Sequence, residues 1–316
     1  MGGQQTPEVI ALGEALVEIM RPRAGIPLDR PGPFEGPFPS GAPADFASAC
    51  ARLGLSTGFI GSVGDDAFGR LLSSRLAGDG VDLTHLLVDA ERATGTAFVT
   101  YREDGGRDFL FHLKHAAAAQ VPAIEPEYFG RARLVHITGS TLASSPEWRA
   151  ACLQAATLGK QAGARVSFDP NIRPELLGGA SIEEVCGPIV ALSDVVLPSG
   201  KELAMLAGSG DVLQAVRMLL DRGVSMVIVK EGPQGSTLFT REASVHVPAQ
   251  AREERDPTGA GDAFAGGIAY GLLHGLEPER MLRIANAVGG LAVTRLGPME
   301  GTPTLAEALQ AAGLPS

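Results

Sequence analysis

The sequence predicts an α/β protein with a mostly parallel central sheet and a small additional β-sheet, on three observations. Short apolar runs bounded by turn residues alternate with longer segments in which apolar residues recur at helical spacing. A strand–turn–strand pattern interrupts this alternation at residues 96–113. The 316-residue chain is long enough to bury a large core in one or two domains.

The predicted strands of the central sheet are continuous apolar runs without polar alternation. Runs of this kind are typical of strands that are covered on both faces of a parallel sheet. They lie at residues 9–12, 57–63, 134–137, 166–168, 195–197 and 226–229.

Helices are predicted between and after these strands. The alternation of the two kinds of segment indicates βαβ units with helices on both faces of the sheet. The predicted helices cover residues 44–53, 67–76, 146–161, 182–192, 213–220, 259–273 and 277–294, and the last two are rich in Gly and Ala.

The additional sheet is predicted from residues 14–39, which are rich in Pro and Gly, and from residues 94–115. In the latter, strands at 96–102 and 108–113 flank a Gly-rich turn at 103–107. Residues 1–13, 40–93 and 116–316 would then form the α/β core. A small inserted sheet of this kind is expected to act as a lid over an active site.

Composition excludes several classes of protein. Asp plus Glu number 36 and Lys plus Arg 26, so the net charge of −10 argues against nucleic acid or an anionic membrane as the main partner. The three cysteines form no CxxC pair, which argues against a disulfide framework or a zinc site. No signal peptide and no apolar run of membrane-spanning length is visible, so we expect a cytoplasmic protein.

The chemistry is predicted at residues 256–267, which read DPTGAGDAFAGG. Small residues just before a helix leave backbone N–H groups free to bind an anion, and the helix dipole favours negative charge there. Asp262 lies in the first helical turn beside this anion site. The arrangement suits transfer of a phosphoryl group onto a hydroxyl whose proton Asp262 accepts. The alternative is that Asp262 only stabilises the helix N-terminus.

The same segment resembles the C-terminal signature of the ribokinase-like (PfkB) carbohydrate kinases. Further motifs of that family follow in the expected order along nearly the whole chain. They are residues 40–45 (SGAPAD), 51–54 (ARLG), 61–69 (GSVGDDAFG), 94–111, 168–173 (FDPNIR), 230–235 (KEGPQG) and 286–287 (NA). The resemblance implies a ribokinase-like three-layer α/β/α core with a β lid, and an ATP-dependent sugar kinase.

By this resemblance, Asp262 is the catalytic base and Gly259, Ala260 and Gly261 form the anion hole. ATP is expected along the C-terminal part of the chain, at Lys230, Gly232, Gly235, Asn286 and Ser199. The chain has neither a GxxxxGK[ST] motif nor a GxGxxG after a predicted strand, so a P-loop enzyme and a nicotinamide-binding protein are disfavoured.

Two metal ions are implied by the resemblance. Glu202 would hold Mg²⁺ through water, although Ser199 stands where the family usually has Asn, and Glu202 can also be read as a first-turn helix acid. A monovalent cation, with K⁺ as the candidate, would lie beside the anion hole. The backbone oxygens that bind it would come from Asp256, Thr258, Ala292, Arg295 and Gly297.

The sugar site is less regular than the rest of the motif set. Substrate contacts are assigned to Gly41, Ala42, Asp45, Arg173, Glu18 and Lys114. Asp45 replaces the usual Asn with a carboxylate, which would bind hydroxyls and repel an acidic sugar, whereas Arg173 favours negative charge. His112 and His115 are either sugar-facing or lid-surface residues.

The resemblance to fructokinases is stronger than that to 2-keto-3-deoxygluconate kinases, so phosphorylation of a primary hydroxyl of a fructose-like sugar is preferred. The alternatives are an acidic sugar, a pentose as in ribokinase, or a non-catalytic sugar- and nucleotide-binding relative. A phosphohydrolase is disfavoured because no added nucleophile or metal cluster is visible. Exposed strands of the lid would suit a homodimer.

Overall fold

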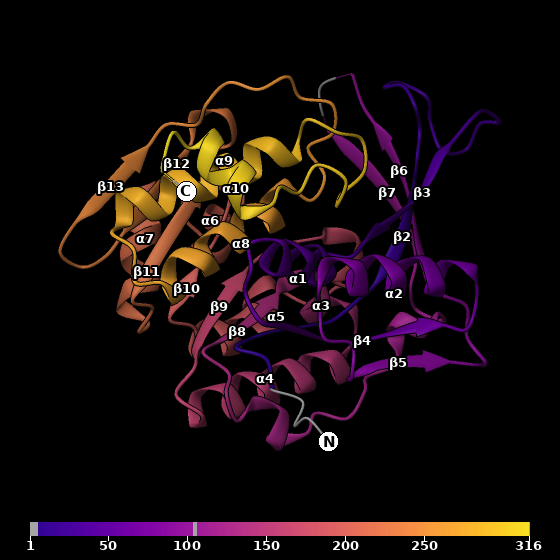
Figure 1. The fold of residues 1–316 in the computed structure, drawn as a ribbon, viewed down its shortest axis with the longest axis horizontal. Helices are drawn as coiled ribbons and strands as arrows, with labels where there is room; N and C mark the ends of the chain where they lie inside the picture. Colours follow the sequence, from indigo (N-terminus) through magenta and orange to yellow (C-terminus); the bar gives the residue numbers. More distant parts are fainter. Residues whose placement is uncertain (1–5, 104–105, 316) are drawn as a thin grey trace.

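A computed structural model of the chain describes residues 6–103 and 106–315. It has the predicted α/β architecture, with a large sheet between two helical layers and a second, smaller sheet at one end (Figure 1). Residues 104–105 of the predicted turn at 103–107 lie outside the described ranges. Residues 1–5, at the N-terminus where no signal peptide was expected, also lie outside them.

The larger sheet has the strand order β13-β12-β11-β10-β9-β8-β1-β4-β5. All neighbouring strands from β11 to β5 pair in parallel. The antiparallel pairings are β11 with β12 and β12 with β13, so the sheet is mostly parallel as predicted. Its strands are β1 (Val9–Leu12), β4 (Thr57–Gly64), β5 (Leu86–Asp89), β8 (Leu134–Thr138), β9 (Arg165–Asp169), β10 (Val195–Val196), β11 (Met226–Lys230), β12 (Ser236–Phe239) and β13 (Ser244–Val247).

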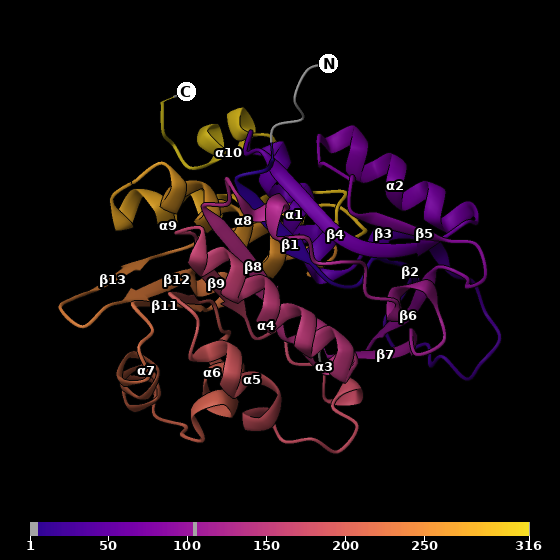
Figure 2. The ribbon, with the colours of Figure 1, turned by 90° about the horizontal axis from the view of Figure 1, so that it is seen from below.

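Two groups of helices cover the two faces of this sheet (Figure 2). One face packs against α3 (Gly139–Ser144), α4 (Pro146–Gln161), α5 (Ile182–Val190), α6 (Gly200–Ala207) and α7 (Val212–Asp221). The other face packs against α1 (Ala42–Arg52), α2 (Ala67–Asp79), α8 (Ala260–Leu273) and α9 (Pro278–Ala292), and α10 (Leu305–Ala311) lies outside them.

Strand β1 illustrates why these segments form a sheet that is buried on both faces. Its four residues are fully buried; Ile10 and Leu12 point into one core, and Val9 and Ala11 into the other. The period of two along a strand requires this division. The small residues predicted to permit close helix packing do so, because Gly267 of α8 has no room for a Cβ against Ala285 of α9.

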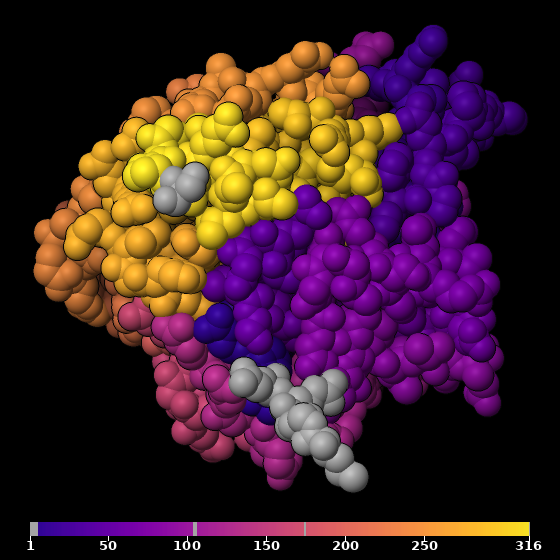
Figure 3. All heavy atoms as spheres, viewed as in Figure 1, coloured from indigo at the N-terminus to yellow at the C-terminus, as the bar shows by residue number. Residues whose placement is uncertain are grey.

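The smaller sheet, which we call the lid sheet, has the order β3-β2-β6-β7. Its strands are β2 (Leu16–Met20), β3 (Glu35–Ser40), β6 (Gly95–Tyr101) and β7 (Arg107–His112). The Arg21 side chain is buried beside it and donates to the carbonyl oxygens of Pro27, Arg30 and Pro33, which holds the long β2–β3 connection in place. Figure 3 shows the N-terminal part of the lid sheet lying against the C-terminal segment of the chain. Between these two parts, Phe38 of β3 packs on Gly297.

Several elements were not predicted. They are the edge strand β5, the antiparallel pair β12 and β13, and the short helices α3, α6 and α10. Strand β7 also begins at Arg107, a residue that the sequence analysis placed in the turn.

Among the described residues, no single helix is long and apolar enough to cross a membrane. Helices α6 and α7 meet the criterion of length and composition only when taken together, and they are bent by 57° at the break between them.

Candidate active site

A cavity of about 630 Å³ lies between the lid sheet and the edge of the large sheet where its parallel strands end. Glu14 follows β1, Ser140 follows β8, Asp169 ends β9, Ser199 follows β10 and Lys230 ends β11, and all five line it. Ligands of open α/β sheets bind at this edge because the loops after parallel strands gather there.

Gly259 begins helix α8 and shapes the anion hole predicted from the sequence. Its φ of 75° is in the left-handed region, and a Cβ there would lie 2.3 Å from the carbonyl oxygen of Pro298. Glycine is therefore required at this position. Gly259, Ala260 and Gly261 all line the cavity with the first turn of α8, whose N–H groups lack helical partners.

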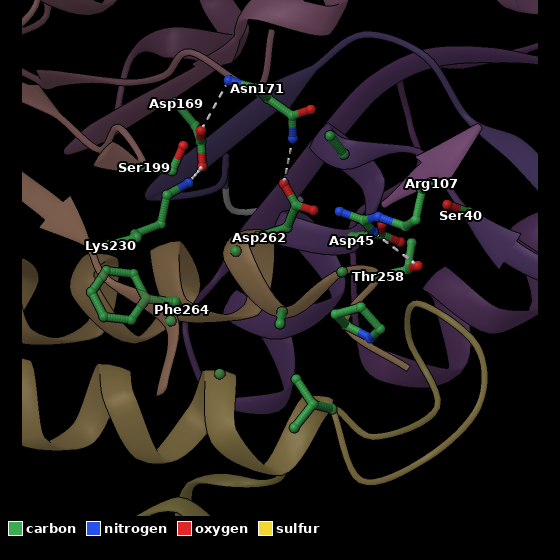
Figure 4. A pocket seen from close by; sticks show the side chains of 18 of the residues that line it. Ser40, Asp45, Arg107, Asp169, Asn171, Ser199, Lys230, Thr258, Asp262 and Phe264 are labelled. Atoms are coloured by element: carbon green, nitrogen blue, oxygen red, sulfur yellow. Dashed lines mark hydrogen bonds and ion pairs between the residues drawn. The ribbon is translucent and has the colours of Figure 1, made fainter. Parts of the chain in front are cut away.

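Asp262 lies in that first turn and faces the cavity (Figure 4). Asn171 Nδ2 lies 3.3 Å from its Oδ1. Burial of the carboxyl group, together with repulsion from Asp169, raises the pKa of Asp262 to about 8 against the attraction of Lys230 and Arg173. A carboxyl group with this pKa is suited to accept a proton near neutral pH.

Lys230 forms an ion pair with Asp169, with 2.6 Å between Nζ and Oδ2. Burial lowers the pKa of Lys230, but Asp169 and Glu202 outweigh burial and hold the pKa above its usual value. The Lys230 Nζ also lies close to Gly261, 3.3 Å from the point where a Cβ added to this glycine would stand. A fixed positive charge therefore stands beside the predicted anion hole.

Glu202 and Ser199 form a capping box at the start of α6. Glu202 Oε2 accepts from the backbone N–H of Ser199 and Oε1 from that of Ile172. Burial raises the pKa of Glu202, but Lys230 and the bonds from Ser199 outweigh burial and hold the pKa below its usual value. Glu202 is therefore an ionised carboxylate in the cavity wall.

This carboxylate suits Mg²⁺, which in nucleotide sites takes one or two carboxylates, waters and phosphate oxygens. The described residues contain no cluster of three or more His, Cys, Asp or Glu side chains that could hold a metal alone. The donor set therefore fits a Mg²⁺ ion that is shared with a nucleotide.

The remaining predicted nucleotide residues line the end of the cavity next to α9. Gly232 and Gly235 are there with left-handed φ angles of 56° and 105°. Asn286 also lines it, and its amide bridges Ser236 Oγ and the carbonyl oxygen of Val247. This amide braces the hairpin of β12 and β13 against α9.

The other end of the cavity holds most of the predicted sugar residues. Gly41, Ala42, Asp45, Glu18 and Arg173 line it. A Cβ on Gly41, whose φ is 117°, would lie 2.3 Å from the carbonyl oxygen of Glu14, so the backbone there approaches β1 closely.

Lys114 is a correction to the predicted sugar site. It follows β7, is exposed, and is not among the residues that line the cavity. His112 and His115 are exposed and outside the cavity wall as well, which leaves the lid-surface alternative. The cation that the lid contributes is Arg107, with Phe109 and Phe111 on the same face of β7. Side chains two residues apart in a strand lie on the same face, so extending the strand back from Phe111 and Phe109 would have placed Arg107 on the cavity face.

The predicted cation loop is bound to the lid sheet. Asp256 is fully buried; its Oδ1 accepts from Tyr101 Oη at 2.5 Å and from the N–H of Thr258, and its Oδ2 accepts from the N–H of Gly297. Arg107 Nη1 donates to Thr258 Oγ1 at 3.1 Å. Ala292 is buried nearby and Arg295 is exposed. The structure thus brings Asp256, Thr258 and Gly297 together.

Sequence reasoning did not assign Glu14, Arg107, Tyr101, Asp169 or Asn171 to the site. Asp169 and Asn171 belong to the quoted FDPNIR motif. The left-handed φ of 34° at Asn171 is unusual for a residue other than glycine.

Comparison with known proteins agrees with this site. The family model described as "pfkB family carbohydrate kinase" matches residues 36–305. Fructokinase-1 of Zea mays is 36% identical over 315 residues, with 96% of each chain covered. The chain therefore belongs to the pfkB family of carbohydrate kinases, and its fold is the ribokinase-like α/β fold.

Solved structures give the same result. A putative ribokinase II from E. coli, solved in complex with ATP and Mg²⁺, is 41% identical with a TM-score of 0.90, covering 97% of this chain and 99% of that one. Fructokinase from Vibrio cholerae O395, solved with fructose, ADP and a calcium ion, is 29% identical with a TM-score of 0.84, covering 97% and 99%. A double mutant of the latter was solved with fructose, ADP and a potassium ion. The chain is accordingly a sugar phosphotransferase.

Proposed function

We propose that this chain transfers the γ-phosphoryl group of ATP to the primary hydroxyl of a small ketose, with fructose as the first substrate to test. The observation that carries the proposal is the position of Asp262. Its carboxyl group lies in the first turn of α8, next to the anion hole, in the one cavity whose opposite ends hold the predicted sugar and nucleotide residues.

In the proposed reaction, the sugar lies under the lid sheet with its primary hydroxyl at Asp262. Asp262 takes the hydroxyl proton while the sugar oxygen forms a bond to the γ-phosphorus and the bond from that phosphorus to the ADP oxygen breaks. The N–H groups of the Gly259–Gly261 turn stabilise the charge on the phosphoryl oxygens. Asn171 orients the carboxyl group through its contact with Oδ1.

Lys230 and Glu202 have complementary roles in this proposal. Lys230 is held by Asp169 and faces the phosphoryl oxygens, and Glu202 holds Mg²⁺ through water. When it is bound, Mg²⁺ neutralises phosphate charge. A monovalent cation such as K⁺ would bind beside Asp256 and Thr258, where the loop at Ala292, Arg295 and Gly297 closes the site.

The alternative substrate is an acidic sugar such as 2-keto-3-deoxygluconate, and the specific observation in its favour is Arg173 in the cavity wall. An ADP-release assay with MgATP and K⁺ separates the two. Turnover of fructose supports the proposal, and turnover of the keto acid alone would reverse the substrate preference. If neither these sugars nor ribose is phosphorylated while ATP still binds, the result favours the alternative that the chain is a non-catalytic protein that binds sugar and nucleotide.

We further propose a homodimer that forms through the lid sheet. Asp108, Leu110 and His112 of the edge strand β7 all point outward, and Leu110 is 48% exposed. Edge strands with exposed apolar residues pair readily with another chain. Light scattering should give twice the chain mass, and Leu110→Arg should return it to that of one chain.

We also propose that the enzyme acts in the cytoplasm, where ATP is supplied. The three cysteines are free and buried, which suits a reducing compartment. Fractionation of cells that express the tagged chain tests this.

A further inference from the structure

The sugar end of the cavity contains carboxyl groups that protein donors leave incompletely bonded. Asp45 is 5% exposed and Glu18 is 6% exposed, and both line the cavity. Asp45 Oδ1 and Glu18 Oε2 have no hydrogen-bond partner. Buried carboxylate oxygens without partners are costly, so they indicate that a ligand supplies the donors.

Neighbouring Glu14 differs in this respect and serves as an internal comparison. Its two oxygens accept from Ser140 Oγ and Thr141 Oγ1, each at 2.6 Å. Glu18 accepts only one such bond, from Ser40 Oγ to Oε1 at 2.8 Å. Asn171 Oδ1 also lacks a partner, but among the glutamates and aspartates that line the cavity the partnerless buried oxygens belong to Asp45 and Glu18, the pair that lies nearer the lid and α1.

The positive charges near these two groups donate hydrogen bonds to other residues, although Arg107 and Arg173 still act to lower the pKa of Glu18. Arg107 donates to Thr258, and Arg173 donates to the carbonyl oxygen of Ile172, with its guanidinium 5.6 Å from the ring centre of Phe109. Arg75, whose charge acts to lower the pKa of Asp45, is bonded to Asp79 and Glu300.

The charges that act on Asp45 are therefore mostly negative. Burial first, and then repulsion from Asp262 and Glu18, raises its pKa well above the usual value, so Asp45 holds its proton until a positive group stands beside it. Four acidic side chains, Glu14, Glu18, Asp45 and Asp262, stand against two arginines at this end of the cavity.

We propose that Asp45 and Glu18 form a cation-selective subsite, and that the preferred substrate is a ketose carrying a protonated amino group as well as its primary hydroxyl. An ammonium group donates up to three hydrogen bonds and accepts none, which matches the oxygens of ionised carboxylates, and its positive charge would favour that ionised form. It also supplies the missing positive charge, and charged hydrogen bonds are the stronger ones. The inference rests on the proposed kinase function and names the substrate class of that same site.

The test compares fructose with amino-deoxyfructoses that carry the amine at carbon 1, 3 or 4, at a pH below the pKa of the amine. Calorimetry in the presence of Mg²⁺ and a non-hydrolysable ATP analogue measures binding, and ADP release measures turnover. We expect at least one amino sugar to bind at least about tenfold more tightly than fructose, since a hydrogen bond to a charged group stabilises more than a neutral one.

Asp45→Asn is the decisive variant because it removes the charge and keeps the shape. It should lower the affinity for the amino sugar more than that for fructose, so that the preference for the amine is lost. Asp29→Asn removes the same charge from an exposed position in the β2–β3 connection and should retain the preference. Thermal unfolding of each variant confirms that it is folded.

Three results would overturn the inference: fructose binding as tightly as every amino sugar, a preference for 2-keto-3-deoxygluconate, or an amine preference that persists in Asp45→Asn. If fructose is phosphorylated without an amine preference, the subsite fails and the kinase proposal stands. If an amino sugar binds in an Asp45-dependent way without turnover, the subsite stands and the kinase proposal fails. Failure of all these sugars to bind overturns both.

Discussion

The Tyr101 hydroxyl donates to Oδ1 of Asp256 across 2.5 Å, and this bond joins the lid sheet to the loop that leads into the anion hole. The two residues are 155 positions apart in the chain. The same hydroxyl lies 3.1 Å from Thr258 Oγ1. Since Thr258 directly precedes Gly259, the position of the lid sheet and the shape of the anion hole are mechanically linked.

Tyr101→Phe should therefore impair both catalysis and stability. The change removes one buried hydrogen bond to a carboxylate, which costs about 1–3 kcal/mol. We expect kcat to fall by about tenfold and the affinity for ATP to depend less on the presence of sugar, because the lid no longer orders the loop. Steady-state kinetics and nucleotide titrations with and without sugar measure this. Tyr270→Phe, on the far part of α8, is the matched control, and equal effects of the two changes would refute the link.

Asp262→Asn should reduce kcat by about 10²–10⁴, the range for loss of a general base, with nucleotide affinity nearly retained. The amide keeps the shape of the side chain but cannot accept the hydroxyl proton. The exposed Asp65 provides the control Asp65→Asn. Wild-type turnover in Asp262→Asn would show that another group is the base.

The pH profile should carry the signature of Asp262. Because the pKa of Asp262 is raised to about 8, kcat/KM should rise with pH and level off above about that value. The free energy of unfolding should change with pH in the opposite direction. The folded state holds this proton more tightly than the unfolded chain, so the group's contribution to stability falls as pH rises from about 4 to 8. Asp262→Asn should therefore raise the melting temperature at pH 8 more than at pH 5. An unchanged difference between the two pH values would contradict the raised pKa.

The Lys230–Asp169 pair should behave as a buried ion pair. Lys230→Met leaves Asp169, which is fully buried, without its partner, and we expect a loss of about 3–5 kcal/mol in unfolding free energy. The double change Lys230→Met with Asp169→Asn should recover much of the stability, because the fully buried side chain at position 169 no longer carries a charge. It should not recover activity, since the positive charge beside the anion hole is absent. Denaturant titration and the ADP assay on the unmodified chain, Lys230→Met, Asp169→Asn and the double variant test both statements. Activity in the double variant would show that Lys230 takes no part in the reaction.

The lid cations should differ sharply in their effect on the sugar. Arg107→Gln removes a guanidinium from the cavity wall, so KM for the sugar should rise about tenfold or more with a smaller change in KM for ATP. Lys114→Gln is a charge-matched control in the same hairpin, and it should change neither value by more than about twofold, because Lys114 is exposed outside the cavity. If the two variants behaved alike, the assignment of Arg107 would be wrong.

The central sheet could be predicted from the sequence because its strands are buried on both faces and therefore read as continuous apolar runs. The hairpin of β12 and β13 escaped prediction, since its strands, STLF and SVHV, mix polar with apolar residues and carry only four residues each. Helix α6 escaped for a different reason. It has eight residues, and its start at Ser199 was interpreted as a metal motif, although the same side chains also form a capping box.

The site was predictable where its residues are neighbours in sequence, as in the segment from Asp256 to Asp262. It was not predictable where partners come together only through the sheet order. Lys230 and Asp169 are 61 positions apart, and they meet because β9 and β11 flank β10. Arg107 was missed because one residue of uncertainty in the end of a turn decides which face of a strand a side chain occupies.

The cavity takes its polar side chains one at a time from separate strand ends, and this bears on how the enzyme can evolve. Glu14, Asp169, Ser199 and Lys230 each follow or end a different strand, and Asp45 comes from a helix. Because none of these side chains is needed for strand pairing, a lineage can exchange one that lies outside the Lys230–Asp169 ion pair while the remaining scaffold stays folded. New substrate preferences can therefore arise by single codon changes, without an intermediate that has lost its architecture.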